Sequence, residues 1–194
     1  MTTTSGKAAP VRRAITGCLI AGCALTGALG ISTTLAPRAW SQNNTATTLF
    51  PLDAGNQLQT QLVLNCHQAT GSCDFTASAN TLTPDGAVIG FPADLWARQT
   101  TEIRPTNRLT YLDAHANGQF ERVMKEGGSD VITTVYMGGG APEKYQTNGV
   151  IDATDWSTGQ PKTNAAVIAC THIQVVYGGV NITSPSTCAQ SAFS

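Results

Sequence analysis

Charged residues are scarce in this sequence. They make up 12% of its 194 residues, and 11 basic residues nearly balance 12 acidic ones. No run of five or six like charges occurs, so the sequence predicts neither a polybasic lipid-binding patch nor an acidic tail. Because four of the 11 basic residues lie within residues 1–41, the remainder holds seven basic residues against all 12 acidic ones, a net charge of −5. This balance argues against nucleic acid as a partner.

Familiar catalytic motifs are missing as well. The sequence has no G-x-S-x-G elbow, no H-E-x-x-H helix, no phosphate-binding P-loop and no Rossmann glycine fingerprint. The only run of three glycines, at 138–140, leads into Ala141-Pro142 without a predicted helix or a suitably placed lysine, and we expect a loop there. We therefore expect no cofactor, and a non-enzymatic role is favoured over an enzymatic one.

Long hydrophobic runs are absent except near the N-terminus. Three basic residues precede the largely apolar stretch 14–35, and small residues follow it up to Ser41. This three-part pattern is typical of a secretory signal, with cleavage expected near Ser41. Residues 1–41 are thus predicted to be a signal peptide or an N-terminal membrane anchor, which places the rest of the chain outside the cytoplasm.

Three other fates of this segment stay open. Arg12-Arg13, followed by a weakly hydrophobic stretch, also suits twin-arginine export. The tetrapeptide ending at Cys23 resembles a lipobox, although the run stays apolar where a lipidated cysteine would lead into a polar tether. Left uncut, the 22 residues from Ala14 to Leu35 would just cross a bilayer of roughly 30 Å and hold the domain outside.

Two of the six cysteines lie in this N-terminal segment, and the others are Cys66, Cys73, Cys170 and Cys188. In an exported chain we expect two disulfides rather than a zinc site, because the spacings do not resemble paired C-x-x-C knuckles. Residues 61–66 and 73–78 both alternate, and facing Cys66 to Cys73 across a hairpin brings Leu64 opposite Phe75. One register thus satisfies both the bridge and the core. Cys170 is then left to pair with Cys188 and hold down the C-terminal end.

The rest of the chain has the residue pattern of an all-β domain. Segments rich in Val, Ile, Thr and Tyr recur about every 8 to 12 residues between turn signals such as the one at 83–86, a spacing typical of a sandwich or barrel. We predict a single antiparallel β-sandwich over residues 58–194, with a closed meander barrel as the alternative. Residues 42–57 are polar apart from one Leu-Phe-Pro-Leu island and are interpreted as a tether that docks once.

Two segments give the clearest strand patterns. Residues 95–104 alternate between an apolar set and a largely polar set, which predicts a strand with one buried face. Residues 167–177 carry apolar side chains on both alternate sets, so both faces should be at least partly covered. We expect this segment to be the last and most central strand.

Asn117-Gly118 is the clearest hairpin signal, because a type I′ turn needs positive φ at both of its positions. Folding the chain there sets Asp113 opposite Arg122 and His115 opposite Phe120. The competing prediction is a short helix over residues 119–126, where apolar residues occur at helical spacing. The hairpin is favoured by the strand-rich context.

Histidine supplies the few candidates for chemistry. Asp113 and His115 are expected to share a strand face, so they could form a base with its orienting carboxylate or part of a metal site. His172, close to Cys170, is the other catalytic candidate. Neither a third ligand nor a nucleophile can be read from the spacing, so no metal site is expected. Asp152 and Asp155 beside Trp156 could also serve a glycosidase, but a turn in which Asp caps backbone amides and Trp156 folds inward is favoured.

Exposed aromatic residues are the better indication of a binding surface. Trp96 and Arg98 are expected on the polar face of one strand, and Trp156 in a loop. Tryptophan and arginine often anchor interfaces. The alternative is that another loop of the same domain covers Trp96.

Three functions remain open, in an exported protein whose composition suggests a GC-rich bacterium. The first is a cell-envelope or secreted β domain that binds an envelope protein, a glycan or a lipid without chemistry. The second is a small-molecule or lipid carrier with an internal apolar cavity. The third is an extracellular hydrolase that uses His115 or His172. Contact with a membrane is expected only through an uncleaved N-terminal segment.

Overall fold

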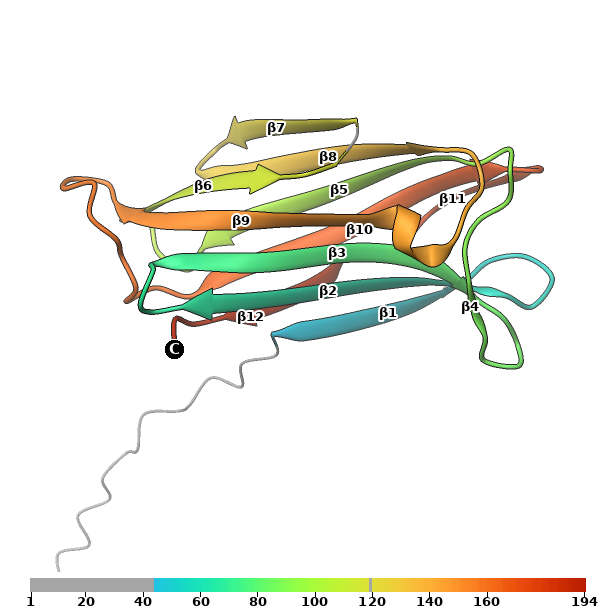
Figure 1. Cartoon of the computed structure of the whole chain (residues 1–194), viewed down its shortest axis with the longest axis horizontal. Coiled ribbons are helices and arrows are strands. Elements are labelled where there is room, and N and C mark those ends of the chain that lie inside the picture. The colour runs from blue at the N-terminus through green and yellow to red at the C-terminus, as the bar shows by residue number, and fades with distance from the viewer. Residues whose placement is uncertain (1–43, 119) are drawn as a thin grey trace, which may run out of the picture. The chain divides into compact units, whose positions relative to one another are not determined.

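The computed structural model describes residues 44–118 and 120–194, so the predicted signal or anchor at 1–41 lies outside the described residues. In these two ranges, no helix has both the length and the hydropathy needed to cross a membrane. The strands form two six-stranded sheets, A and B, and every pairing between strands is antiparallel. The all-β sandwich is confirmed (Figure 1).

Sheet A has the strand order β1-β2-β3-β9-β6, with a two-residue strand β4 beside β3. Its strands are β1 (Thr45–Pro51), β2 (Gln57–His67), β3 (Ser72–Leu82), β4 (Val88–Ile89), β6 (Thr110–Ala116) and β9 (Gln146–Asp155). A short 3-10 turn, η1 (Pro142–Tyr145), precedes β9.

Sheet B has the order β11-β10-β5-β8-β7, with β12 also paired to β10. Its strands are β5 (Trp96–Pro105), β7 (Glu121–Glu126), β8 (Ser129–Met137), β10 (Val167–Tyr177), β11 (Val180–Thr183) and β12 (Thr187–Ser191). The predicted strand at 95–104 is confirmed as β5, with its alternate residues buried. The segment 167–177 is confirmed as β10, but two short strands follow it and β5 lies nearer the middle of the sheet.

Apolar side chains from both sheets fill the space between them. One cluster packs Leu64 and Phe75 of sheet A against Ile103 and Val167 of sheet B, and a second surrounds Tyr145. These residues occupy alternate strand positions, which is why their side chains point to the same face of each sheet. A closed barrel is wrong, because β6 and β7 lie at the edges of different sheets and do not pair.

A buried polar network also joins the sheets. The Tyr136 hydroxyl on β8 donates to Gln99 Oε1 at 3.0 Å and lies 2.7 Å from Thr147 Oγ1 on β9. Burial raises the pKa of Tyr136 to about 12, so the phenol stays protonated. The space between the sheets therefore also contains threonine side chains, such as Thr147. An alternation of apolar and polar residues in the sequence does not by itself identify such positions as buried.

Both predicted disulfides are present. Cys66–Cys73, the hairpin disulfide, joins β2 to β3, and Leu64 lies opposite Phe75 in the predicted register. Cys170–Cys188, the C-terminal disulfide, joins β10 to β12. Two intact disulfides are compatible with a location outside the cytoplasm.

The interpretation of residues 42–57 as a tether is wrong for most of its length. Residues Thr45–Pro51 form β1, which pairs with β2 along its whole length. Within it, Ala46, Thr48 and Phe50 point to the half-buried side, while the intervening residues are exposed. Threonine is polar in composition but favours strands, so this edge strand resembles a linker when judged by polarity alone.

The predicted hairpin at Asn117-Gly118 is also wrong, and so is the competing helix. Strand β6 pairs with β9 in sheet A, whereas β7 pairs with β8 in sheet B, so the chain crosses between sheets at this point. Neither Asn117 nor Gly118 has a positive φ. The hairpin instead turns at Gly127-Gly128, where φ is 60° and 91°, as a type I′ turn requires.

Candidate functional site

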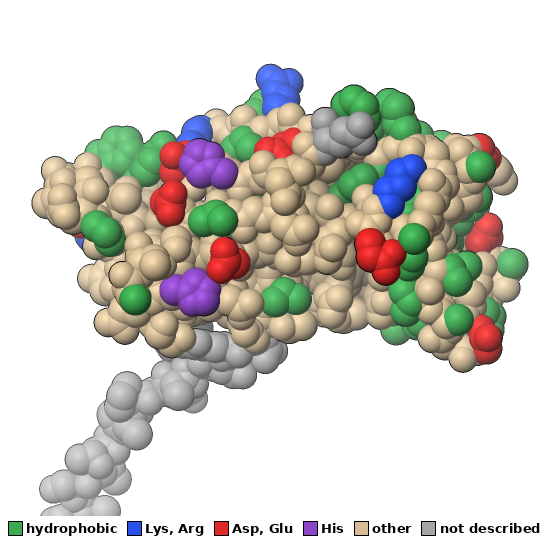
Figure 2. Space-filling model, viewed as in Figure 1, with side chains coloured by type: hydrophobic (Ala, Val, Ile, Leu, Met, Phe, Trp, Pro, Cys, Tyr) green, Lys and Arg blue, Asp and Glu red, His purple; other side chains and the backbone are tan. Residues whose placement is uncertain are grey.

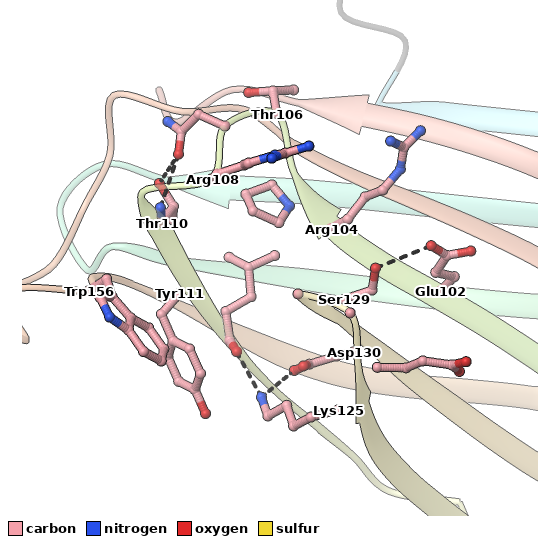
Figure 3. Close-up of a pocket in the computed structure, with 16 residues that line it drawn as sticks. Glu102, Arg104, Thr106, Arg108, Thr110, Tyr111, Lys125, Ser129, Asp130 and Trp156 are labelled. Carbon is pink, nitrogen blue, oxygen red and sulfur yellow. Dashed lines mark hydrogen bonds and ion pairs between the residues drawn. The ribbon is translucent and has the colours of Figure 1, made fainter.

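A groove of about 1050 Å³ lies at one end of the sandwich and is open to solvent. It is bordered by the connection 105–109 between β5 and β6, by β6 itself, by the β7–β8 turn and by Trp156 after β9 (Figure 3). Each wall is therefore held at the end of a paired strand. The groove is thus bordered by paired strands and by the loops that connect them, and binding sites are often found on such loops.

Two aromatic side chains form one wall of the groove. Tyr111 points outward from β6, and Trp156 follows the last residue of β9, which pairs with Thr110. Their ring centroids are 5.5 Å apart, with the ring planes at 54°. Trp156 is 75% exposed and Tyr111 is 37% exposed. Figure 3 shows the two rings side by side, across the groove from Arg104. Trp156 therefore offers most of its surface to a ligand, and Tyr111 offers part of its own.

The loop that carries Trp156 is braced by Asp155. Its carboxylate accepts hydrogen bonds from the backbone N–H and the hydroxyl of Ser157, and it also forms an ion pair with Lys162. The Lys162 ammonium and the Ser157 donors hold the pKa of Asp155 far below its usual range. The expected capping by Asp155 is confirmed, but the expectation that Trp156 folds inward is wrong. The brace fixes the loop and leaves the indole in solvent.

A charged clasp closes the side of the sandwich beside the aromatic pair. Lys125 Nζ on β7 donates to Asp130 at 2.7 Å, to Asp113 at 2.9 Å and to the Leu112 carbonyl at 2.7 Å. Asp130 is buried and also accepts from the Ala114 N–H at 2.6 Å. Burial opposes the Lys125 charge, but the hydrogen bonds to Asp130 and Asp113 raise its pKa above the ordinary value. Lys125 also lies 4.7 Å from the centre of the Tyr111 ring and so helps to position it.

Polar groups face the aromatic wall. Arg104 and Arg108 are exposed in the groove lining, and neither belongs to an ion pair within 44–118 and 120–194. Ser129 donates to Glu102 at 3.2 Å, and Asn107 Oδ1 accepts three hydrogen bonds that hold the loop before β6. The groove therefore offers donors and acceptors opposite stacking faces.

The predicted binding residues do not form one site. Trp156 lies in the groove, but Trp96 and Arg98 lie toward the opposite end of β5, on the outer face of sheet B. The nine residue steps from Trp96 to Pro105 span roughly 30 Å. Tyr111, Arg104 and Arg108 were not singled out from the sequence. The outward alternation of Tyr111 along β6 is the signal that could have identified it.

The predicted catalytic residues do not assemble either. His115 Nε2 lies 3.4 Å from Asp113, as the sequence predicted, but that carboxylate is shared with Lys125, which through its hydrogen bond lowers the pKa of Asp113. His115 is well exposed, and no hydrogen bond joins it to a serine, threonine or cysteine in the part of the chain that the structure describes. His172 lies on the outer face of the other sheet, where burial and the nearby Arg98 lower its pKa. A second pair, His67 with Asp74 at 3.0 Å, was not foreseen.

No three His, Cys, Asp or Glu side chains are grouped to hold a metal ion within 44–118 and 120–194. No protein-family model and no curated protein matches the chain. The fold and the site together define a disulfide-stabilised β-sandwich with an open aromatic and polar groove at one end.

Proposed function

We propose that this chain is an exported binding module of the cell envelope or the surrounding medium, which binds a glycan in the groove beside Trp156 without chemistry. The N-terminal signal or anchor pattern and the two disulfides support a role outside the cytoplasm. A composition typical of a GC-rich bacterium supports a bacterial source.

The observation that carries the proposal is the accessible Tyr111–Trp156 pair. A large aromatic surface left in water costs free energy that burial would recover, about 25 cal/mol per Å² of apolar area. Here the loop is held by Asp155 in the conformation that keeps Trp156 exposed. A ligand that covers the indole would recover that free energy at a site already ordered.

The lining favours a glycan over the other ligands. A sugar ring has an apolar face of C–H groups that stacks on an aromatic ring, and hydroxyl groups at its edge that hydrogen-bond to polar side chains. Arg104, Arg108 and Asn107 provide such partners across from Trp156. A lipid carrier needs an enclosed apolar cavity. This groove is open and lined by polar and charged as well as apolar side chains, and apolar side chains fill the space between the sheets. A hydrolase needs a histidine beside both an acid and a nucleophile. Among residues 44–118 and 120–194, His115 has Asp113 beside it but no hydrogen bond to a serine, threonine or cysteine, and His172 has neither partner.

An array of envelope and extracellular glycans tests the proposal directly. The exported protein is applied to fragments of peptidoglycan, arabinan, galactan, mannan, glucan and chitin. We expect retention on at least one of them, and we expect Trp156→Ala or Tyr111→Ala to weaken it at least tenfold, as loss of an aromatic anchor does. Leu49→Ala is the control, because it shortens an exposed side chain on edge strand β1, away from the groove and from the outer face of sheet B.

Two results would overturn this function. One is that no glycan on the array retains the wild-type protein more strongly than the Trp156→Ala variant. The other is release of reducing ends from a retained glycan, which would mean hydrolysis. The export part of the proposal is tested separately by the mass of the protein taken from its host, which is expected to begin near Gln42 if the signal is cleaved.

A further inference from the structure

The two outer faces of the sandwich differ in chemistry. On sheet A, the outward positions of β2, β3 and β9 carry mostly glutamine, asparagine, serine and threonine. Figure 2 looks onto this side, and most of the surface in view is neither hydrophobic nor charged. Polar side chains of this kind hydrogen-bond to water, so this face gives no indication of a binding partner.

The outer face of sheet B is far more apolar. Trp96 on β5 lies between Met137 of β8 and Val176 of β10 in one row across the sheet. Met137 is 58% exposed, and Phe120 and Met124 toward β7 are also exposed. Half-buried aliphatic side chains continue the surface, namely Val131, Val135 and Ile168. Together with Arg98 and Arg104, this is the composition of a protein interface, in which Trp, Met and Arg are enriched.

The order of side chains along β5 indicates what covers this face. The outward residues run Trp96, Arg98, Thr100, Glu102, Arg104. We propose that the outer face of sheet B binds the same face of a second copy of this chain, around a two-fold axis that crosses β5 at Thr100. With the two β5 strands antiparallel, Arg98 of each copy faces Glu102 of the other, and Arg104 faces Trp96. Both are favourable contacts, a charge-assisted pair and a cation–π pair, and the symmetry forms each of them twice.

The neighbouring strand β8 matches under the same axis. Thr133 pairs with Thr100, so the axis crosses β8 there and brings the two Thr133 side chains together. Two positions along, Val135 of one copy faces Val131 of the other. Aliphatic groups thus meet aliphatic groups in the register that the charges on β5 require.

Strand β10 matches as well. His172 pairs with Thr100 and lies on the axis, and Val176 comes to face Ile168 of the other copy. Two histidines can meet there without repulsion because burial and the nearby Arg98 lower the pKa of His172, so the ring is neutral at pH 7. The two Arg122 side chains also meet near the axis, but they extend from edge strand β7 and reach solvent.

The size of the face agrees with a reversible dimer. Ten residues of β5 span roughly 30 Å, and five strands cover roughly 20 Å across, so each copy would bury about 600 Å². A standard interface buries about 800 Å² per partner, which places this one at the small end, where weak and reversible association is typical, and we take a Kd of about 1–100 µM as the range to test. This interface leaves out Tyr111 and Trp156 but shares Glu102 and Arg104 with the lining of the groove, so the dimer is measured in the absence of glycan.

Sedimentation velocity of the full exported protein, with its disulfides intact, tests the dimer over about 1–300 µM, a range that brackets the expected Kd. We expect a concentration-dependent dimer. Arg98→Glu and Glu102→Arg should each weaken it at least tenfold by setting like charges opposite one another. The double variant R98E/E102R restores opposite charges in exchanged positions and should recover most of the wild-type affinity. Gln61→Glu, on the outer face of sheet A, is the matched control for an added charge.

Each result decides the proposal. A wild-type protein that stays monomeric at about 300 µM, three times the weakest Kd expected, overturns it. Single variants that dimerise normally, or a double variant as weak as the singles, overturn the proposed axis. Circular dichroism of every variant separates loss of the dimer from loss of the fold. None of these results depends on whether a glycan binds.

Discussion

Asp130 holds the edges of the two sheets together, and replacing it gives the sharpest test of the fold. Its buried carboxylate accepts from the Ala114 N–H of sheet A and from Lys125 of sheet B. Asp130→Ala removes the carboxylate oxygen that accepts both hydrogen bonds, and leaves the buried N–H and the ammonium group without this partner. Breaking a buried pair by removing one member costs about 3–5 kcal/mol. We expect the low end, about 3 kcal/mol, because Lys125 keeps Asp113 as a partner and its side chain is 44% exposed.

Thermal and urea unfolding measure this loss. For a domain of about 150 residues, 3 kcal/mol lowers Tm by about 6–12 °C, and the urea m-value should not change. Glu126→Ala on the same hairpin is the matched control, because that carboxylate is exposed, and it should cost less than about 0.5 kcal/mol. Equal losses for Asp130→Ala and Glu126→Ala would refute the clasp.

A double-mutant cycle separates the ion pair from its surroundings. Lys125→Met leaves Asp130 buried without its cation, and Asp130→Leu removes the carboxylate. The double variant Lys125→Met/Asp130→Leu replaces the pair with apolar groups. We expect the double variant to be more stable than the sum of the single losses predicts, by about 1–3 kcal/mol. Strict additivity would mean that the two residues do not act together.

Three further predictions follow from the same structure. The C-terminal disulfide lies on an outer face and the hairpin disulfide is buried, so mild reduction followed by alkylation should label the former first; equal labelling would contradict this order. Gly149→Ala should destabilise the domain more than Gly86→Ala, because its Cβ would lie 2.2 Å from the His115 carbonyl oxygen and 2.4 Å from the Phe75 ring. Gly86 has open space, so its substitution carries only the strain of its positive φ, roughly 1–2 kcal/mol; similar Tm values would show that β9 can shift. Finally, Lys125→Met should return the pKa of Asp113 toward its ordinary 3.8, since the hydrogen bond from Lys125 lowers it. Because the pKa of Asp113 is lower in the folded than in the unfolded protein, its contribution to stability is present above pH 3.8 and is lost as the pH falls through the folded pKa. The effect is modest because the carboxylate is partly exposed. An NMR titration of Asp113 that Lys125→Met leaves unchanged would disprove the contact.

The sequence predicts the fold well where two constraints agree on one register. Cys66 and Cys73 needed to meet, and the alternation around them allowed only one pairing that also buried Leu64 and Phe75. The long segment 167–177 was equally clear, because apolar residues fill both of its alternate sets. In the hairpin that contains Cys66 and Cys73, the disulfide and the burial of apolar residues both require the same strand register.

Prediction failed where a local signal competed with contacts far along the chain. Asn117-Gly118 has the composition of a tight turn, but the Asn117 N–H donates to the Asn148 carbonyl of β9 and extends sheet A instead. The threonine-rich strand β1 was missed because its identity comes from pairing with β2. The deciding partner of Asn117 lies 31 residues along the chain, and the partners of β1 lie 6 to 18 residues along it.

The site was only partly visible in the sequence for a related reason. Trp156 stood out as a residue type, but its exposure depends on the hydrogen bonds of Asp155 within the loop. Tyr111 becomes its neighbour only through the pairing of β6 with β9, and Arg104 and Arg108 join them through the β5–β6 connection. Sequence spacing cannot supply these contacts, because strands from both sheets create them.

The most direct test of the central claim is an NMR titration of the isotope-labelled protein with an oligosaccharide taken from a glycan that the array retains. We predict that the Trp156 indole N–H and the backbone signals of residues 105–111 and 125–130 shift together, and that the oligosaccharide remains intact throughout. Shifts confined to either outer face of the sandwich, or cleavage of the oligosaccharide during the titration, would contradict a non-enzymatic glycan site in the groove.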